Sequence, residues 1–587
     1  MAKKQKLELT WIGKDEQPQL EPRILIEEPT GSYGDRSAEN ILIHGDNLLA
    51  LKALEQDFTE KVQCIYIDPP FNTEQAFEHY DDGVEHSIWL TLMRQRLTVM
   101  HRLLHPSGSF FVHIDDNELG YLIAVCDEVF GRKNRVSIIT FKQSSSSGPK
   151  AVNPGLVTTA NYILFYSKDK ARWKNFKVFV PTGRDSRYNH YIVNYEEDFS
   201  EWHLINLRNA LADSLGMATK NLRKHFAGNL ESTLEKFVLQ EPHRVVRTAR
   251  VAPKDVNKSA RDALGKSVET PNVVFRSQRE GKNDYYFLNG EQLLFYSTKA
   301  REVNGTTTTA QAATNLWDDI LSNNLHKEGQ VRFPNGKKPE LLLKRILDMS
   351  TEAGDWVLDS FLGSGTTSAV AHKMNRRWIG VELRDHAETH CIPRLQNVCD
   401  GTDQDGASRA VKWEGGGGFR CYDLAPSLLQ KDKRGNWVIS DGYNPNMLAA
   451  AMAKHEGFKY CPNHETYWKQ GQSSEKDFIF TTTSFVQVAF IDRIHEEMET
   501  DEHLLICCKK FSAACSRRYP NIEIKKIPKM LLGKCEFGRD DYSLNIVNMP
   551  VDGDQPEFVP SGPPKPKRKK GHPNPAQLDL FDMEGQS

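Results

Sequence analysis

One stretch of the 587-residue sequence decides the fold class: WVLDSFLGSGTTSAVAHKMNRRWIGVE, Trp356–Glu382. A short apolar segment leads into the loop Gly363-Ser364-Gly365, a helix-forming segment starts at Thr366, and a second apolar segment ends at Glu382. Glycines let a chain turn sharply and approach a ligand closely, and the first N–H groups of a helix are free to bind one. The order of strand, glycine-rich loop, helix and strand predicts a unit of a doubly wound α/β sheet.

The acid at the end of this stretch, Glu382, suggests what the loop holds. An acid at the tip of the second strand can accept hydrogen bonds from both ribose hydroxyls of a nucleoside cofactor. A nicotinamide-binding fold would look similar, although Ser368 stands where its third glycine is expected. The other interpretation of this stretch alone is a purely structural turn between a strand and a helix.

A second motif, CIYIDPPFNTEQ at Cys64–Gln75, ends another apolar strand. Pro69 and Pro70 cannot donate hydrogen bonds and they fix their own φ, so the strand stops rigidly, with Asp68 and nearby carbonyls as acceptors. Such acceptors beside the ring of Phe71 suit one task, which is holding the planar amino group of a nucleobase. If the acceptors take both N–H bonds, the nitrogen lone pair can localise toward an electrophile. A simple proline turn is the alternative interpretation of the tetrapeptide alone.

The alternation of strand and helix patterns divides the chain into regions. It covers residues 39–167, which contain DPPF, and it returns at residues 325–412, which contain FLGSG. Between them, residues 168–324 have the pattern of long polar helical segments rich in arginine and aromatic residues, interpreted as an inserted domain. The EGGGG stretch is interpreted as a joint that opens a C-terminal α/β domain at residues 413–551. The predicted ends are a polar, turn-rich segment at residues 1–38 and a disordered tail at residues 552–587.

Composition and charge narrow the class of protein. The 39% hydrophobic and 26% charged residues predict globular domains, and no apolar run approaches the roughly 18 residues of a membrane span. The ten scattered cysteines are typical of reduced thiols in a cytoplasmic protein, and Cys461 with His464 forms only one weak ligand pair, so no metal site is predicted. The net charge of −2 does not exclude nucleic acid, because a local basic groove suffices.

Together, DPPF and DSFLGSGTT resemble the signatures of DNA amino-methyltransferases that use S-adenosylmethionine. Their order, with DPPF first, then a long insert, then the glycine-rich loop, is that of the beta-class permutation. Further segments resemble the modification (Mod) subunit of type III restriction-modification systems and cover most of residues 41–425: HGDNLLALKAL, GSFFVHIDDNEL, LWDDILSNNLHKEGQVRFPNGKKPELL and GGGGFRCYDL. The resemblance implies a permuted, Rossmann-like class I methyltransferase sheet with an inserted target-recognition domain.

The resemblance also implies roles for particular residues. The catalytic set would be Asp68, Pro69, Pro70 and Phe71, where phenylalanine replaces the commoner tyrosine and preserves stacking. Asp46 would lie near the cofactor adenine, and Glu382 would take the ribose hydroxyls. The remaining predicted cofactor-binding residues are Asp359, Phe361, Gly363, Ser364, Gly365, Thr366, Phe333, Lys338 and Pro339.

The implied activity is methyl transfer to N6 of adenine in duplex DNA, with the base flipped out at an unstacking cost of about a few kcal/mol. Asp68 in place of serine favours adenine by resemblance, whereas physical reasoning leaves N4 of cytosine open, since both targets are ring-conjugated amines. A nicotinamide-dependent oxidoreductase would leave DPPF and the insert without a role. A methyltransferase of protein glutamine or RNA would share both motifs but usually has asparagine in place of Asp68. A scaffold that has lost catalysis is disfavoured because both motifs are intact.

Partners follow from the insert and the tail. Arginine suits bidentate reading of guanine and clamping of phosphate, so the candidate contacts to double-stranded DNA are Arg184, Arg187, Arg244, Arg247, Arg250 and Lys254. The loop Ser144–Gly148 is expected to order on DNA. The family tends to dimerise, which predicts a homodimer, and the sequence has no GxxxxGK[ST] loop, so a helicase-nuclease restriction subunit would be a separate chain.

The segment QLDLF resembles the short peptide by which bacterial proteins dock on the DNA-polymerase sliding clamp. Its predicted clamp-binding residues are Gln577, Leu578, Leu580 and Phe581.

Overall fold

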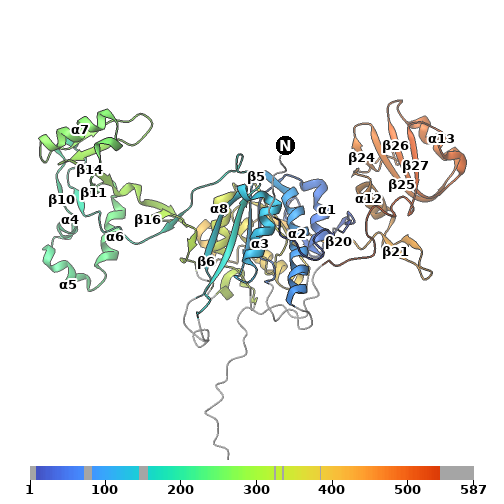
Figure 1. Ribbon diagram of the computed structural model, residues 1–587, viewed down its shortest axis with the longest axis horizontal. Coiled ribbons are helices and arrows are strands. Elements are labelled where there is room, and N and C mark those ends of the chain that lie inside the picture. The colour runs from blue at the N-terminus through green and yellow to red at the C-terminus, as the bar shows by residue number, and fades with distance from the viewer. Residues whose placement is uncertain are drawn as a thin grey trace, which may run out of the picture.

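The computed structural model describes residues 8–16, 18–71, 82–144, 156–320, 322, 325–333, 336–383 and 385–542. Figure 1 shows three lobes in a row, with a large central lobe between one that holds the insert and one that holds the C-terminal region. Within the described ranges, no helix combines the length and apolar character needed to cross a membrane. The predicted clamp peptide and residues 145–148 of the serine loop lie outside the described residues.

The central lobe is built on one large mixed sheet. The described residues form an 11-stranded sheet in which all neighbours from β20 to β5 are parallel and β7 is antiparallel to both of its neighbours. Along the sheet its strands are β1 (Leu25–Glu27), β20 (Gly418–Leu424), β3 (Ile41–His44), β19 (Arg377–Glu382), β18 (Trp356–Asp359), β4 (Val62–Ile67), β5 (Leu104–Ile114), β7 (Ala160–Ser167), β6 (Arg135–Lys142) and β17 (Leu316–Trp317), with β2 (Tyr33–Gly34) paired to β20.

Helices cover both faces of this sheet, which confirms the predicted doubly wound α/β fold. One face carries α1 (Asn47–Phe58), α2 (Asp82–Leu103) and α3 (Leu119–Cys126); the other carries α8 (Glu340–Ser350), α9 (Thr366–Lys373) and α10 (Ile392–Cys399). All of β4 is buried, with Ile65 and Ile67 in the first apolar layer and Cys64 and Tyr66 in the second. A strand buried on both faces has no polar side, which explains why Gln63 is the one polar residue in its sequence.

The strand order brings the two sequence motifs together. β19, β18 and β4 are consecutive parallel neighbours, with Leu358 of β18 opposite Ile65 of β4 and Asp359 opposite Gly380 of β19. Their carboxyl ends therefore meet at one edge of the sheet. DPPF follows β4, FLGSG follows β18 and Glu382 ends β19, so the three features share this edge, where ligands bind in open α/β sheets.

Near β1 and β20, the central sheet differs from the organisation predicted from the sequence. The segment expected to be turn-rich loop contains β1, which pairs antiparallel with β20, so it extends the sheet. The GGGG stretch leads directly into β20, and a Cβ at Gly418 would lie 2.3 Å from the backbone nitrogen of Asp35, so this glycine is required by close packing of two backbones. The C-terminal domain was expected to begin at residue 413, but β20 belongs to the central sheet.

The insert was expected to be mainly helical, and this prediction is wrong. Its described residues form a 6-stranded and a 3-stranded sheet with short helices. The sequence signal is the pair Asn289-Gly290, which joins β13 and β14 with positive φ values of 50° and 80° and is the preferred turn of a two-residue β-hairpin. The elements are β8 (Phe179–Pro181), β9 (His190–Ile192), β10 (Leu204–Asn206), α4 (Leu207–Ser214), α5 (Leu222–Phe226), α6 (Leu230–Gln240), β11 (Val245–Ala249), α7 (Lys258–Glu269), β12 (Phe275–Ser277), β13 (Tyr285–Leu288), β14 (Glu291–Phe295), β15 (Ala300–Val303) and β16 (Thr306–Ala312).

The C-terminal lobe is a separate α/β unit, as the sequence pattern indicates. A 5-stranded sheet carries an apolar core on each face, and a hairpin of two short strands precedes it. Its elements are β21 (Leu429–Lys431), β22 (Trp437–Ile439), α12 (Pro445–His455), β23 (Lys459–Tyr460), β24 (Gly471–Ser474), β25 (Asp477–Val486), α13 (Val488–Glu497), β26 (His503–Phe511) and β27 (Ile522–Lys526). No group of three or more potential metal ligands exists in the described ranges, which cover both Cys461 and His464.

Candidate active site

The glycine-rich loop is held by hydrogen bonds to the acids at the ends of its two strands. The Asp359 carboxylate accepts from the Phe361 N–H at 2.9 Å and from the Thr367 hydroxyl at 2.6 Å, and Glu382 Oε2 accepts from the Gly363 N–H at 2.7 Å. A carboxylate has about four acceptor sites, so Glu382 can hold the loop and still accept from ribose hydroxyls. Asp359 and Glu382 therefore fix the conformation of the loop and also lie beside it.

Two glycines of this region serve different purposes. Gly363 has a φ of 56°, and a Cβ added there would meet no atom within 4 Å, so this side of the loop is open to a ligand. A Cβ at Gly380 would lie 2.6 Å from Leu362 Cδ2 and 2.9 Å from Ser368 Oγ. Gly380 therefore lets the loop and the start of α9 pack directly on β19.

Burial sets the charge state of the acid below the loop. Desolvation, with smaller contributions from the charges of Asp68 and Glu382, raises the pKa of Asp359 to about 7 against the lowering effect of its hydrogen bonds. Three carboxyl groups thus converge on one edge of the sheet. A ligand that carries positive charge would relieve their repulsion, whereas an anionic ligand would increase it.

The turn after β4 holds its aspartate against a lysine. The Nζ of Lys338 lies 2.9 Å from Asp68 Oδ2 and 5.4 Å from the centre of the Phe71 ring. The side chain of Lys338 is only 7% exposed and that of Asp68 is 19% exposed, so the pair is largely shielded from water. The structure therefore brings Lys338, expected among the cofactor residues, into contact with the predicted catalytic acid.

Two further groups support the turn. The indole Nε1 of Trp89 donates to the Pro70 carbonyl at 3.0 Å, which anchors the turn and leaves that oxygen a second lone pair. The ring of His113 stacks on Phe71 at 6.3 Å and an interplanar angle of 24°, and its Nδ1 lies 3.2 Å from the Tyr66 hydroxyl. Burial, with a contribution from the charge of Lys338, holds the pKa of His113 well below its usual value, so the ring is neutral.

Other predicted cofactor residues lie around this edge in different settings. Asp46 is buried and caps α1 through the Leu49 N–H at 3.0 Å, and it also contacts Arg96 at 3.4 Å and the Tyr542 N–H at 3.1 Å. Its role near a cofactor adenine stays a prediction. The remaining predicted residues support the surroundings: Phe333 packs edge-on against His386 and His390, Pro339 precedes α8, and Gly365 caps α9 with a φ of 78°.

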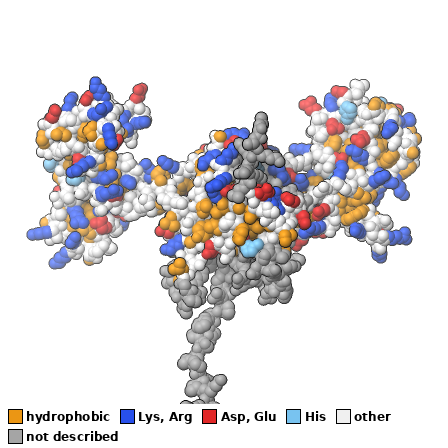
Figure 2. Space-filling model, viewed as in Figure 1, with side chains coloured by type: hydrophobic (Ala, Val, Ile, Leu, Met, Phe, Trp, Pro, Cys, Tyr) orange, Lys and Arg blue, Asp and Glu red, His pale blue; other side chains and the backbone are white. Residues whose placement is uncertain are grey.

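Most of the arginines proposed to contact DNA are engaged within the insert. Arg184 pairs with Glu231 at 2.7 Å, Arg187 with Asp185 at 2.7 Å and Arg244 with Glu196 at 3.0 Å, while the guanidinium of Arg247 stacks over Tyr188. Arg250 is 95% exposed and Lys254 lies on the surface. Figure 2 shows Lys and Arg side chains interspersed with acidic ones on this lobe.

Sequence reasoning overlooked two residues at the site: His113 at the middle of a buried strand, and Arg394, which reaches the loop from α10. It named Lys338 only as a cofactor residue, whereas the structure places it against Asp68. The signal for Lys338 was the family resemblance of the segment LWDDILSNNLHKEGQVRFPNGKKPELL, which contains it. His113 and Arg394 have no local signal, since their contacts come from segments distant in the sequence.

The family model for DNA methylases matches residues 62–391, which is more than half of the chain and contains both motifs and all three convergent acids. The chain belongs to the DNA methylase family. Among curated relatives, "Probable type III restriction-modification enzyme HindVI Mod subunit" of Haemophilus influenzae is 37% identical over 66% of this chain and 54% of its own length. The type III restriction-modification enzyme EcoP15I Mod subunit of Escherichia coli is 24% identical over 73% of each chain.

A third relative, the type II methyltransferase M.EcaI of Enterobacter cloacae, is 27% identical over 58% of this chain and 66% of its own. The two Mod subunits among these relatives confirm the resemblance that the motifs indicate. This DNA methylase spans about half the length of the H. influenzae relative that it matches.

Proposed function

We propose that this DNA methylase transfers a methyl group from S-adenosylmethionine to N6 of adenine in duplex DNA, at a specific site, with the adenine flipped out of the helix. The observation that carries the proposal is the meeting of Asp68 with the glycine-rich loop at one edge of the sheet, where β4 and β18 are adjacent and parallel. An amine held by Asp68 and a cofactor held by the loop would then face each other.

In this mechanism the protein orients the amine instead of removing its proton first. Asp68 accepts a hydrogen bond from the exocyclic amine and a backbone carbonyl of the proline turn accepts the second, so the nitrogen lone pair points toward the cofactor. Phe71 stacks on the flipped base, and the neutral ring of His113 backs Phe71. After transfer, the amine carries an extra proton, which an oxygen of Asp68 can take.

The residues fit S-adenosylmethionine, which when bound supplies an electrophilic methyl group on a cationic sulfur. The open side of Gly363 gives the chain room to approach a ligand, and the convergence of Asp359, Asp68 and Glu382 favours a positive charge. Glu382 would accept from the ribose hydroxyls, while the loop from Phe361 to Gly365 and the start of α9 would hold the methionine part. Phe333 and Pro339 would complete the pocket, while Lys338 holds Asp68 beside it.

The first test is transfer of tritiated methyl from S-adenosylmethionine to unmethylated duplex DNA, followed by nucleoside analysis. We expect label in N6-methyladenine with wild-type protein and none with Asp68→Ala. A thermal shift with S-adenosylhomocysteine should persist in the variant, because the loop is intact, and NAD should give no shift. Label in N4-methylcytosine would favour the alternative target, and label in RNA or protein would reject DNA as the substrate.

The family relatives support a role in a type III-like restriction-modification system. We therefore include double-stranded DNA, a second copy of this chain and a separate helicase-nuclease restriction subunit among its partners, in the cytoplasm. Coexpression with a restriction subunit followed by copurification tests the last of these. Cleavage that requires both chains would support it, and failure to copurify would count against it.

Docking on the sliding clamp through Gln577–Phe581 remains a separate proposal that rests on the sequence alone. Leu580→Ala combined with Phe581→Ala should abolish clamp pull-down and leave methylation of short oligonucleotides unchanged. Pull-down that survives the double substitution would remove clamp docking from the function.

A further inference from the structure

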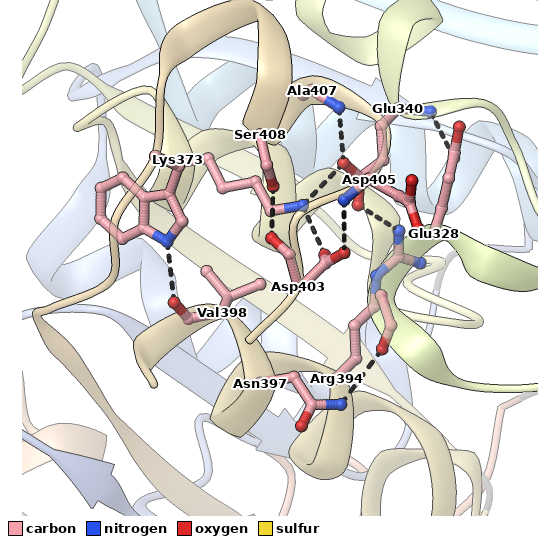
Figure 3. A network of polar contacts seen from close by, with 12 residues as sticks. Glu328, Glu340, Lys373, Arg394, Asn397, Val398, Asp403, Asp405, Ala407 and Ser408 are labelled. Carbon is pink, nitrogen blue, oxygen red and sulfur yellow. Dashed lines mark hydrogen bonds and ion pairs between the residues drawn. The ribbon is translucent and has the colours of Figure 1, made fainter. Parts of the chain in front are cut away.

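A group of buried charges, shown in Figure 3, includes Arg394, which contacts the end of the glycine-rich loop. Glu340 of α8 pairs with Lys373 of α9 at 2.7 Å and with Arg394 of α10 at 2.7 Å, and Lys373 also pairs with Asp403 at 2.5 Å. The side chains of Glu340, Lys373, Arg394 and Asp403 are all 0% exposed. These four residues, here called the buried network, link three helices that cover the same face of the sheet.

Such a network is costly to keep for stability alone. Taking ions out of water costs several kcal/mol per ion, and well-packed apolar residues in place of a buried ion pair are often neutral or stabilising. Burial and the negative charge of Glu340 also raise the pKa of the adjoining Glu328 to about 7. The arrangement therefore points to a requirement for geometry, since charged pairs fix directions that apolar contacts do not.

Within the buried network, Arg394 reaches the loop. Its Nη1 donates to the Ser364 carbonyl at 3.2 Å and to the Thr366 hydroxyl at 2.7 Å, while its Nη2 donates to Glu340. The planar guanidinium thus holds the last part of the loop and the first residue of α9 against α8. A Cβ at Gly329 would lie 2.5 Å from Arg394 Nε, so the neighbouring chain leaves the guanidinium little freedom to move.

The other end of this connection is the catalytic turn. Glu340 begins α8 two residues after Lys338, and Lys338 holds Asp68. The Glu340 N–H is fixed by Glu328 at 2.9 Å, and its carboxylate also accepts from the Ala407 N–H at 2.9 Å, so the start of α8 is anchored on several sides. Arg394, Glu340 and Lys338 therefore form a continuous link from the cofactor loop to Asp68.

We propose that Arg394 is a positioning residue that keeps the cofactor loop and the Lys338–Asp68 pair in a fixed relative placement, so that cofactor affinity and methyl-transfer rate depend on it together. The proposal rests on the function proposed above. It identifies a residue outside both sequence motifs that acts on the reaction without touching the substrate. Its contacts differ from those of Asp403, which belongs to the same buried network but contacts Lys373 and not the loop.

The test compares Arg394→Lys with Asp403→Asn in the full-length protein. Lysine keeps the positive charge beside Glu340 but presents no planar fork to bridge the loop and α8. For Arg394→Lys we expect the KM for S-adenosylmethionine and the Kd for S-adenosylhomocysteine to rise about tenfold or more, and kcat at saturating cofactor to fall as well. Asp403→Asn should lower the melting temperature while changing Kd and kcat less than about twofold.

Glu340→Gln provides a second variant if Arg394→Lys does not fold, because the amide keeps one acceptor oxygen for Arg394 while it removes the charge and replaces the other acceptor with a donor. It should change KM and kcat in the same direction. Values of Kd and kcat equal to those of wild type in both variants would overturn the proposal. The proposal would also fail if Asp403→Asn changed Kd and kcat as much as Arg394→Lys does at the same loss of melting temperature. A wild-type protein that binds no S-adenosylhomocysteine would instead reject the proposed function, and the positioning role with it.

Discussion

The Lys338 ammonium lies 2.9 Å from the Asp68 carboxylate, although the two residues are 270 positions apart in the sequence. Asp68 shares its edge of the sheet with Asp359 and Glu382, so three carboxyl groups lie close together there. The Lys338 ammonium offsets part of this negative charge and fixes the position of the Asp68 carboxylate. The pair therefore holds Asp68 in a set orientation, as an acceptor of amine hydrogen bonds requires.

Substitution of Lys338 separates this role from binding of the cofactor. Lys338→Met should lower kcat by about 10²-fold, the typical loss when one preorganised charge is removed from a reacting centre, and leave the Kd for S-adenosylhomocysteine nearly unchanged. Lys338→Arg should lose less activity because it retains the charge. Steady-state methyl transfer and calorimetric binding measure the two quantities. A large rise in Kd with unchanged kcat would instead favour the cofactor contact expected from the sequence.

The raised pKa of Asp359 predicts a dependence of stability on pH. Its pKa is about 7 in the folded protein and near 3.8 when unfolded, so the folded state binds more protons between these values. Stability should therefore decrease as the pH rises from about 4 to about 7 and level off above, by about 4 kcal/mol at most. Asp359→Asn should remove this dependence on pH. The melting temperature of the variant should approach that of wild type as the pH rises and then exceed it. Parallel curves from pH 5 to 8 would contradict the prediction.

Two glycine variants should separate packing of the loop from access of the ligand. Gly380→Ala forces Leu362 and Ser368 to shift and should cost about 1–3 kcal/mol of stability. Gly363→Ala meets no atom but places a side chain at a φ of 56°, which costs about 1–2 kcal/mol, and its methyl group projects into the open side of the loop. Gly363→Ala should therefore show the larger rise in the Kd for S-adenosylhomocysteine relative to its loss of melting temperature. The opposite ranking would mean that this side of the loop does not face the cofactor.

The basic residues of the insert should differ in their effects on DNA binding. Arg250→Ala and Lys254→Ala should each weaken binding and reduce the slope of log affinity against log salt by about one, because each removes an exposed positive charge that is proposed to contact phosphate; that of Arg250 lies 3.6 Å from Glu291. Arg184→Ala should mainly lower the melting temperature of the insert, since Arg184 is largely buried and bonded to Glu231. Fluorescence anisotropy at several salt concentrations provides the measurement. The assignment of Arg250, and not Arg184, to DNA binding would be contradicted if Arg184→Ala changed the salt slope and Arg250→Ala did not.

Local chemistry determined a large part of the fold. The glycines of FLGSG, the prolines of DPPF and the mostly apolar runs of β4 and β18 predict parallel strands with a ligand loop, because each signal depends on neighbours within a few residues. The same reasoning predicted helices in the insert, but Tyr285–Leu288 form a strand of a β-hairpin. Its Asn289-Gly290 turn was the available signal for strands.

The sequence by itself determined which residues end the strands: Asp68, Asp359 and Glu382 follow directly from the pattern of apolar and turn-forming residues. Only the tertiary structure decided what these acids face, because strand order is a long-range property that places β4 beside β18 across the inserted domain. The pairing of Lys338 with Asp68 and the contact of Arg394 with the loop arise in the same way. Such charges are expensive to bury alone, so their partners come from distant segments that only the packed core brings within a few ångströms.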